Sequence, residues 1–550
     1  MELKVKSFIF IFSLFITFPL LAGPNEEFLS LAQSIQDSPI EELPVQNNGR
    51  LKPFHSLARE SILFINGRYQ FEHKASAIQT YLALIIYPKS DQVEIINVRN
   101  KNIRAQLGSL PGNKKNHFSI KQLDKWGLMG RAAPLLDKEQ RNKRSLEPEE
   151  KDLLELYNQY QLTKFIISGN HFLAALDFAS LQGSQNHGQS PPKTLSLAKE
   201  YLRALASQSP NTQELAKQLI ESSFNSPMPP LFEKQKKKIK IEVYYNKLRP
   251  FFIAALFLLF IGLSFFFKQA HPFYNTLLGK ITLSIPLLIL FLGFVARVYI
   301  TGFAPVTNMY GTMIWVSFGV SLFSLILLYL YKSYYAVGSL WIGAGLTLIL
   351  TENLPLILSP NMDPIVAVLR SNLWLTIHVL TIVISYAAFT ITMILSNVAL
   401  VRSLVRSDFS HSIYKEFSKL IYRMTQLGVF LLSVGIILGG VWADYSWGRF
   451  WGWDPKETWA LIADIGYLAI LHARYIGWLK PFGILLASPL AYLLVIMAWY
   501  GVNFILASGL HSYGFSSGGA TMVGIFVATQ LFLLLLAGAN YWKKVKASSH

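Results

Sequence analysis

The second half of this 550-residue chain is a succession of apolar runs, each long enough to cross a lipid bilayer. Because backbone N–H and C=O groups find no water in the hydrocarbon core, such runs must form helices that satisfy their own hydrogen bonds. The pattern predicts an all-α polytopic membrane protein with about nine transmembrane helices. These are expected over residues 251–267, 279–299, 311–331, 336–352, 373–401, 424–442, 458–476, 482–503 and 520–541.

The first 23 residues are typical of a secretory signal. Lys4 and Lys6 precede an apolar run from Phe8 to Leu21, and Ala22 and Gly23 supply small residues for cleavage. We expect a signal peptide over residues 1–23, with an uncleaved signal anchor as the alternative. Either one places the residues that follow outside the cytoplasm.

Residues 24–248 contain no spanning run and predict an α-rich extracytoplasmic soluble domain. Amphipathic patterns predict helices over 147–167 and 195–224, the second interrupted at Pro210, and a weak alternation predicts a strand over 93–98. Nothing here has a catalytic signature. Five histidines are interpreted as ordinary surface or core residues: His55, His73, His117, His171 and His187.

The net charge of +18 is spread over loops between apolar runs. This distribution indicates the positive-inside rule and argues against nucleic acid as a partner. With residues 24–248 outside, the inner loops carry thirteen basic residues and the outer loops after the first span carry four. The lysines between Lys234 and Lys240 oppose this orientation, but long translocated domains are largely exempt from the rule. The predicted C-terminus is cytoplasmic.

The chain has no cysteine. Structural disulfides, a thiol relay and covalent haem attachment to this chain are therefore excluded.

Five of the twelve tryptophans fall between residues 442 and 459, together with glycines and acidic residues. An aromatic belt at a membrane interface is one explanation, although a belt scatters its rings over many helix ends. A loop that forms a platform for a large flat ligand is the other, with Arg449, Asp454 and Glu457 at its polar edge. The tryptophans are Trp442, Trp447, Trp451, Trp453 and Trp459.

Two histidines are predicted on the same membrane face as these tryptophans. His378 lies near the outer start of its helix, and His511 lies in the outer loop between the last two spans. Neutral imidazoles are axial ligands for haem iron, and aromatic rings stack on the macrocycle. The residues by themselves leave haem, a metal site and a substrate channel as alternatives.

His472 lies thirteen residues beyond Trp459 on one predicted helix, or about 20 Å along its axis. An ionisable side chain inside the membrane usually has a function. One hypothesis is a second haem site on the path from the cytoplasm, with Asp464 orienting or charge-balancing the imidazole. Snorkelling of the side chain to the inner interface is the alternative.

The segment from Trp447 to Trp459 resembles the Trp-rich WWD signature of the CcmF/CcmC/CcsA family, the haem-handling membrane proteins of cytochrome c maturation. The CcsA-type subunit of System II cytochrome c synthase is the most similar form. The resemblance extends over most of residues 250–545, through the first outer loop and the three histidine positions. The matching segments are Arg297 with Gly302–Tyr310, Trp374–His378, Leu471–His472 and Gly509–Tyr513, with a weaker likeness at Val45–Pro53.

The resemblance implies that haem b is bound as a substrate, enters at a membrane site using His472, and reaches an outer site. There His378 and His511 would be axial ligands beneath Trp447, Trp451, Trp453 and Trp459, beside Asp454 and Glu457. The vinyl groups would meet the thiols of an apocytochrome c Cys-x-x-Cys-His motif, so the chain would be the haem-handling subunit of a holocytochrome c synthase. Gly311 and Phe303 depart from the family pattern, so no chemistry is assigned to their loop.

The implied partners are a separate ResB/CcsB-type membrane subunit, apocytochrome c, thiol-reducing proteins and the lipid bilayer, without nucleic acid. The implied location is the bacterial cytoplasmic membrane, with the WWD loop at 442–459 outside. Two alternatives remain: a haem transporter or chaperone that serves a separate ligase, and a solute permease with an aromatic gate.

Overall fold

The computed structural model describes residues 26–108, 116–141, 146–177, 192–224, 232–364, 372–405, 411–506 and 519–548. The predicted signal at 1–23 and His511 lie outside the described residues. The chain divides into two compact units, Met1–Val243 and Tyr244–His550.

The first unit is rich in helices and has only short strands among its described residues. Its core surrounds Phe54, whose ring makes edge contacts with Tyr81 at 5.2 Å and Phe172 at 5.3 Å. Its elements are α2 (Glu26–Ser34), η1 (Ile40–Glu42), β1 (Pro44–Asn47), β2 (Arg50–Pro53), α3 (Phe54–Asn66), α4 (Ala77–Ile86), η2 (Ser90–Gln92), β3 (Ile96–Asn97), α5 (Lys101–Leu107), β4 (His117–Phe118), α6 (Ile120–Lys125), α7 (Leu128–Arg141), α8 (Pro148–Ile167), α9 (Asn170–Ala175), α10 (Pro192–Ala206), α11 (Thr212–Phe224) and α12 (Phe232–Leu248), which crosses the boundary between the units.

The predicted helices of this unit are confirmed as α8 and as the pair α10 and α11, with the break at Pro210. The predicted strand over 93–98 was too long. The strand is limited to Ile96 and Asn97, which pair with Phe118 and His117 of β4, and one further backbone bond runs from the N–H of Val98 to the carbonyl of Asn116 at 2.8 Å.

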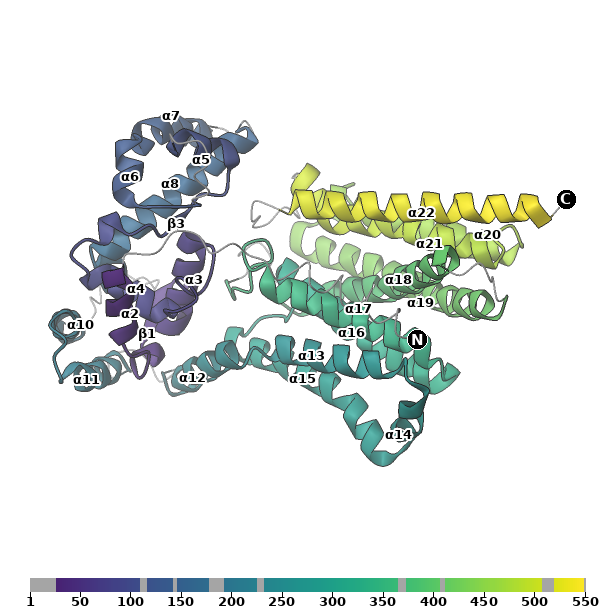
Figure 1. The fold of residues 1–550 in the computed structure, drawn as a ribbon, viewed down its shortest axis with the longest axis horizontal. Coiled ribbons are helices and arrows are strands. Elements are labelled where there is room, and N and C mark those ends of the chain that lie inside the picture. The colour runs from purple at the N-terminus through teal and green to yellow at the C-terminus, as the bar shows by residue number, and fades with distance from the viewer. Residues whose placement is uncertain are drawn as a thin grey trace. The chain divides into compact units, whose positions relative to one another are not determined.

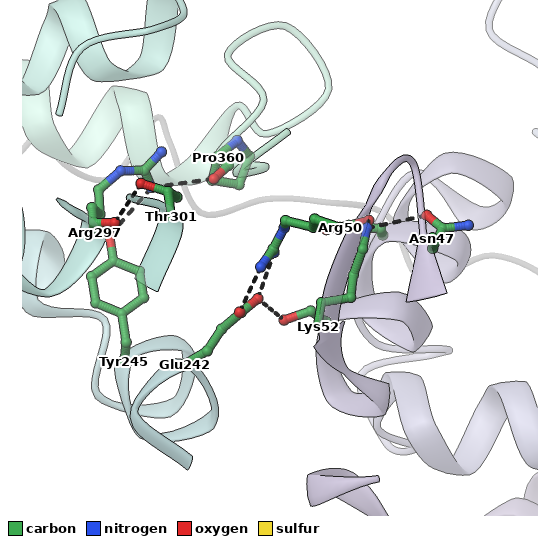
Figure 2. Close-up of polar contacts among 10 residues, drawn as sticks. Asn47, Arg50, Lys52, Glu242, Tyr245, Arg297, Thr301 and Pro360 are labelled. Carbon is green, nitrogen blue, oxygen red and sulfur yellow. Dashed lines mark hydrogen bonds and ion pairs between the residues drawn. The ribbon is translucent and has the colours of Figure 1, made fainter. Parts of the chain in front are cut away.

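The hairpin β1–β2 carries the weaker family-like segment, in the register Val45 to Lys52 and Asn47 to Arg50. The guanidinium of Arg50 donates to both carboxylate oxygens of Glu242 on α12, at 2.8 and 2.7 Å (Figure 2). Ser56 donates to the same carboxylate at 2.6 Å. This bidentate pair, in which Glu242 is buried and Arg50 is partly buried, fixes the α12 segment up to Val243 to the hairpin.

The second unit is a bundle of long apolar helices around its own core (Figure 1). Within it, α18 packs against α16, α19, α21 and α22. Its elements are α13 (Pro250–Ser264), η5 (Lys268–Ala270), α14 (His271–Asn275), α15 (Leu277–Thr301), α16 (Met309–Tyr331), α17 (Tyr334–Asn353), α18 (Asn372–Val405), α19 (His411–Trp447), α20 (Pro455–Tyr475), α21 (Pro481–Ile496), the π-helical run η6 (Met497–Leu506) and α22 (Ala520–Ser548).

All nine predicted membrane segments are helical. Eight stretches of the described chain are long and apolar enough to cross a membrane, so this is a multi-pass membrane protein. The remaining predicted span, α20, is a helix of 21 residues that carries Lys456, Glu457, Asp464 and Arg474. Because of these charged side chains, α20 is not among the stretches that are apolar enough to cross a membrane by composition. The eight stretches are Gln235–Ser264, Leu277–Thr301, Met309–Tyr331, Tyr334–Asn353, Thr376–Val405, Tyr414–Trp447, Pro481–Leu506 and Ala520–Lys544.

A candidate haem cavity in the helical bundle

One end of the second unit encloses a cavity of about 590 Å³. Its walls come from the starts of α16, α18 and α20, the ends of α19 and η6, and the loop after α17. Because successive helices run in opposite directions, these termini belong to one end of the bundle. The volume is within the range of pockets that hold organic ligands.

His378 is one wall of this cavity. Its Nδ1 lies 2.8 Å from the carbonyl oxygen of Gly435 on α19. A carbonyl only accepts, so Nδ1 carries the proton and Nε2 carries the lone pair. A backbone carbonyl holding the second ring nitrogen is the usual way in which a histidine is oriented toward a metal.

Three glycines of α19 make room for side chains packed against the helix, and Gly439 makes room for this imidazole. A Cβ on Gly439 would lie 2.5 Å from Cε1 of His378, and a Cβ on Gly435 would lie 2.7 Å from Ile382. On the adjacent position, a Cβ on Gly440 would lie 2.5 Å from the ring of Phe450, which also lines the cavity. Only glycine, which has no Cβ, lets α19 approach His378, Ile382 and Phe450 this closely.

The tryptophans are distributed between two helices and a short connection. Trp442 and Trp447 belong to α19 and Trp459 to α20, so the predicted loop over 442–459 was too long, because both helices continue into the segment. The connection runs from Gly448 to Asp454 and carries Trp451 and Trp453.

Two of the five tryptophans, Trp442 and Trp451, line the cavity. The ring of Trp442 is nearly parallel to His378, with 8° between the planes and centroids 6.2 Å apart. Trp447 makes an edge contact with Trp442 at 4.7 Å, and Trp453 makes one with Trp451 at 5.8 Å. Trp453 is 70% exposed and has a positive φ of 56°. The cluster thus presents only part of its aromatic surface to the cavity.

Asp454 and Glu457 form a capping box at the start of α20. Asp454 accepts from the backbone N–H of Lys456 at 3.0 Å. Glu457 accepts from the N–H groups of Gly452 at 2.8 Å and Asp454 at 3.1 Å, and its other oxygen lies 3.4 Å from Nη1 of Arg449. Asp454 and Glu457 therefore fix the connection Gly448–Asp454 to the start of α20. Glu457 also lines the cavity.

His472 is placed away from the cavity. It is exposed in the last turn of α20, where Nδ1 donates to the carbonyl of Leu468 at 2.8 Å. Asp464 is buried and accepts from Ser433 on α19 at 2.7 Å, so its observed partner is a serine on the neighbouring helix. In the described part of the chain, no three His, Asp or Glu side chains come together as a metal site.

Several cavity residues were not predicted from the sequence. Trp499 and Asn503 come from η6, and π-helical turns often occur at functional sites. Lys456 and Asp363 add one charge of each sign to the lining. Lys456 and Trp499 could have been predicted as cavity residues, because both lie near helix ends on the predicted outer face. Nothing in the local sequence marks Asp363 or Asn503.

Comparison with known proteins gives a family match that spans the residues lining the cavity. The family described as cytochrome c assembly protein matches residues 306–511, a range that contains every residue of the cavity lining. CcsA of Prochlorococcus marinus (strain MIT 9301), described as a cytochrome c biogenesis protein, is 34% identical over 290 residues, which are 47% of this chain and 90% of that protein. CcsA of Guillardia theta is 34% identical over 242 residues, covering 39% of this chain and 78% of the relative.

A longer relative, protein NrfI of Wolinella succinogenes, is 29% identical over 521 residues. The match covers 86% of this chain and 54% of NrfI, so the chain spans about half the length of that protein. Since residues 244–550 are little more than half of the chain, the likeness to NrfI extends into the first unit.

The fold and the cavity define a multi-pass membrane protein with a cavity at one end of its bundle. Within that class, the chain belongs to the cytochrome c assembly protein family and is of the CcsA type.

Proposed function

We propose that this protein binds haem in the cavity and presents it for thioether attachment to apocytochrome c. The observation that carries the proposal is the orientation of His378. Its Nδ1–H is committed to Gly435, its ring is parallel to Trp442, and its position is on the wall of a cavity of about 590 Å³. An imidazole whose lone pair is on Nε2 suits an axial ligand of haem iron.

The remaining lining fits a macrocycle with an acidic edge. Trp442, Trp451, Trp499 and Phe450 supply apolar faces, and the Lys456 ammonium is a cation for a propionate. In this proposal His511 is the second axial ligand, and His472 serves a separate membrane site. The bond-forming chemistry belongs to the thiols and vinyl groups, while the protein supplies binding and orientation.

We further propose that the site faces the outside of the bacterial cytoplasmic membrane and that a separate ResB/CcsB-type subunit completes the enzyme. Delivery of haem to another ligase is the second candidate, because the same cavity would serve either role. Co-expression with apocytochrome c and the partner separates them: a synthase yields holocytochrome without further ligase components.

The test of the haem site is the visible spectrum of the detergent-purified chain, reduced and oxidised. We compare wild type with His378→Ala and with His271→Ala, a matched control whose imidazole stacks on Tyr334 at 4.0 Å and does not line the cavity. We expect a low-spin haem spectrum that is weakened or shifted only in His378→Ala, and partial rescue of cytochrome assembly by added imidazole. A wild type that remains colourless with its partner co-expressed contradicts the proposal.

A further inference from the structure

Three consecutive carbonyls of the loop after α17 are held by side chains from another part of the bundle. Nδ2 of Asn308 donates to the carbonyls of Ser359 at 3.0 Å and Asn361 at 3.2 Å. Nη1 of Arg297 donates to the carbonyl of Pro360, between them, at 3.2 Å (Figure 2). The amide of Asn308 and the guanidinium of Arg297 thus fix the backbone of residues 359–361.

The loop needs such donors because it has no regular structure between α17 and Pro364. Irregular backbone near the membrane is tolerated only where its polar groups find partners. Ile357, Ser359, Asn361 and Asp363 of this loop line the same cavity as His378. The held backbone is therefore one wall of the ligand site.

The holding residues are themselves fixed. Arg297, on α15, is only 4% exposed, and its guanidinium lies over the ring of Tyr310 at 5.2 Å and 3.4 Å from the hydroxyl of Tyr245. The hydroxyl of Tyr310 donates to Glu352 at 2.5 Å, and Glu352 at the end of α17 also pairs with Arg249 at 3.2 Å. The cluster connects α15, α16 and α17 at the end of the bundle where the cavity lies.

Asn308 has two separable tasks. Its Oδ1 caps α16 by accepting from the N–H of Gly311 at 2.8 Å, while its Nδ2 makes the two bonds to the loop. A capping oxygen is equally available from aspartate or serine, but neither has an amide donor. Helix capping alone therefore does not require asparagine here.

Burying a guanidinium also needs a reason beyond stability. A hydrophobic side chain of similar volume usually stabilises as well as a buried charged group, so a buried arginine is better explained by specific geometry. Besides its contacts with Tyr245 and Tyr310, Arg297 fixes the position of the Pro360 carbonyl.

We propose that Arg297 and Asn308 are positioning residues of the haem site. They fix the cavity wall formed by residues 357–363 and so set how a bound haem is oriented against His378. This inference rests on the proposed function. It assigns a task to Asn308, which lies between Phe303 and Gly311 and caps α16, so that this segment needs no chemistry of its own.

The test removes the loop bonds and keeps the helix cap, using Asn308→Ser and Asn308→Asp. Asn353→Ser is the matched control, since among the described residues Nδ2 of Asn353 donates within α17, to the carbonyl of Ile349. Arg297→Lys, which retains the charge, tests the second donor. Folding of each variant is checked by its elution as a monodisperse species.

Two readouts are used, one of them independent of haem. Because the chain has no cysteine, Met362→Cys, at a side chain that is 5% exposed, gives a single thiol in the loop. Its rate of reaction with a maleimide reports release of the loop. The second readout is the haem spectrum together with the rate of haem loss to apomyoglobin.

We expect about tenfold faster labelling and about tenfold faster haem loss in Asn308→Ser and Asn308→Asp, and no change in Asn353→Ser. Faster labelling with unaltered haem spectrum and loss rate would overturn the positioning role. Unchanged labelling would show that the bonds from Asn308 do not hold the loop in place, and would overturn that part of the proposal. A wild type without haem in the presence of its partner would instead refute the proposed function, whatever the labelling shows.

Discussion

Gly439 offers a sharp test of how the bundle shapes its ligand site. An alanine there places Cβ 2.5 Å from Cε1 of His378, whereas ordinary contacts begin at 3.4 Å. The imidazole or α19 must therefore move by about 0.9 Å, the difference between those two distances. Overpacking of this kind costs about 1–3 kcal/mol. If the ring rotates away instead, it loses the bond to Gly435, worth about 0.5–1.5 kcal/mol.

The matched control is Gly538→Ala on α22, where a Cβ meets no atom within 4 Å. Both substitutions gain about 1 kcal/mol of helix propensity, so their difference isolates the clash. We expect a lower thermal midpoint in detergent for Gly439→Ala than for Gly538→Ala, and a reduced haem spectrum shifted away from wild type in Gly439→Ala alone. Equal midpoints together with unchanged spectra in both variants would refute the inference that Gly439 makes room for the imidazole of His378.

Three further predictions concern other parts of the chain. His472→Ala is expected to lower haem content and cytochrome assembly, and normal haem occupancy in the purified variant would rule out an entry site there. Asp454→Ala is expected to destabilise the start of α20 by about 1 kcal/mol, with Asp454→Ser close to wild type, as measured by thermal midpoint; equal loss in both would contradict capping as its task. In the first unit, burial lowers the pKa of His171 from 6.5 to about 4, with Lys52 nearby, so the unfolded chain binds the proton first. The free energy of unfolding of this unit should fall by up to about 3 kcal/mol as the pH drops from 6.5 to 4, and His171→Gln should flatten that slope in hydrogen exchange of the full chain; the same slope in the variant would assign it to other groups.

Much of the fold follows from local pattern. Apolar runs of membrane length must be helical, because the bilayer offers the backbone no other partner, and all nine predicted segments are helices. The amphipathic segments of the first unit were predicted for the same kind of reason, since their period of about 3.6 places one face in a core. The resemblance carried by the Trp-rich segment and the histidine positions was enough to predict the family.

Sequence did not determine where each side chain lies. Periodicity is silent about how far α19 and α20 extend into the tryptophan segment, since Trp442, Trp447 and Trp459 suit a helix end as well as a loop. Asp454 and Glu457 were expected beside a ligand, and the structure uses them first to cap α20 because the N–H groups there need acceptors. The predicted tasks of His472 and His511 remain predictions.

The sequence by itself determined that nine segments of the second half are helical and apolar in character, and it was enough to predict the family. Only the tertiary structure decided that His378, Gly439 and Trp442 share one wall. It also decided that the carbonyl of Gly435 orients His378, and that Arg297 and Asn308 hold the carbonyls of residues 359–361. The reason is physical. Hydrophobicity and hydrogen-bonding demand act on each segment alone, whereas a cavity exists only where several segments pack and leave matching space between them.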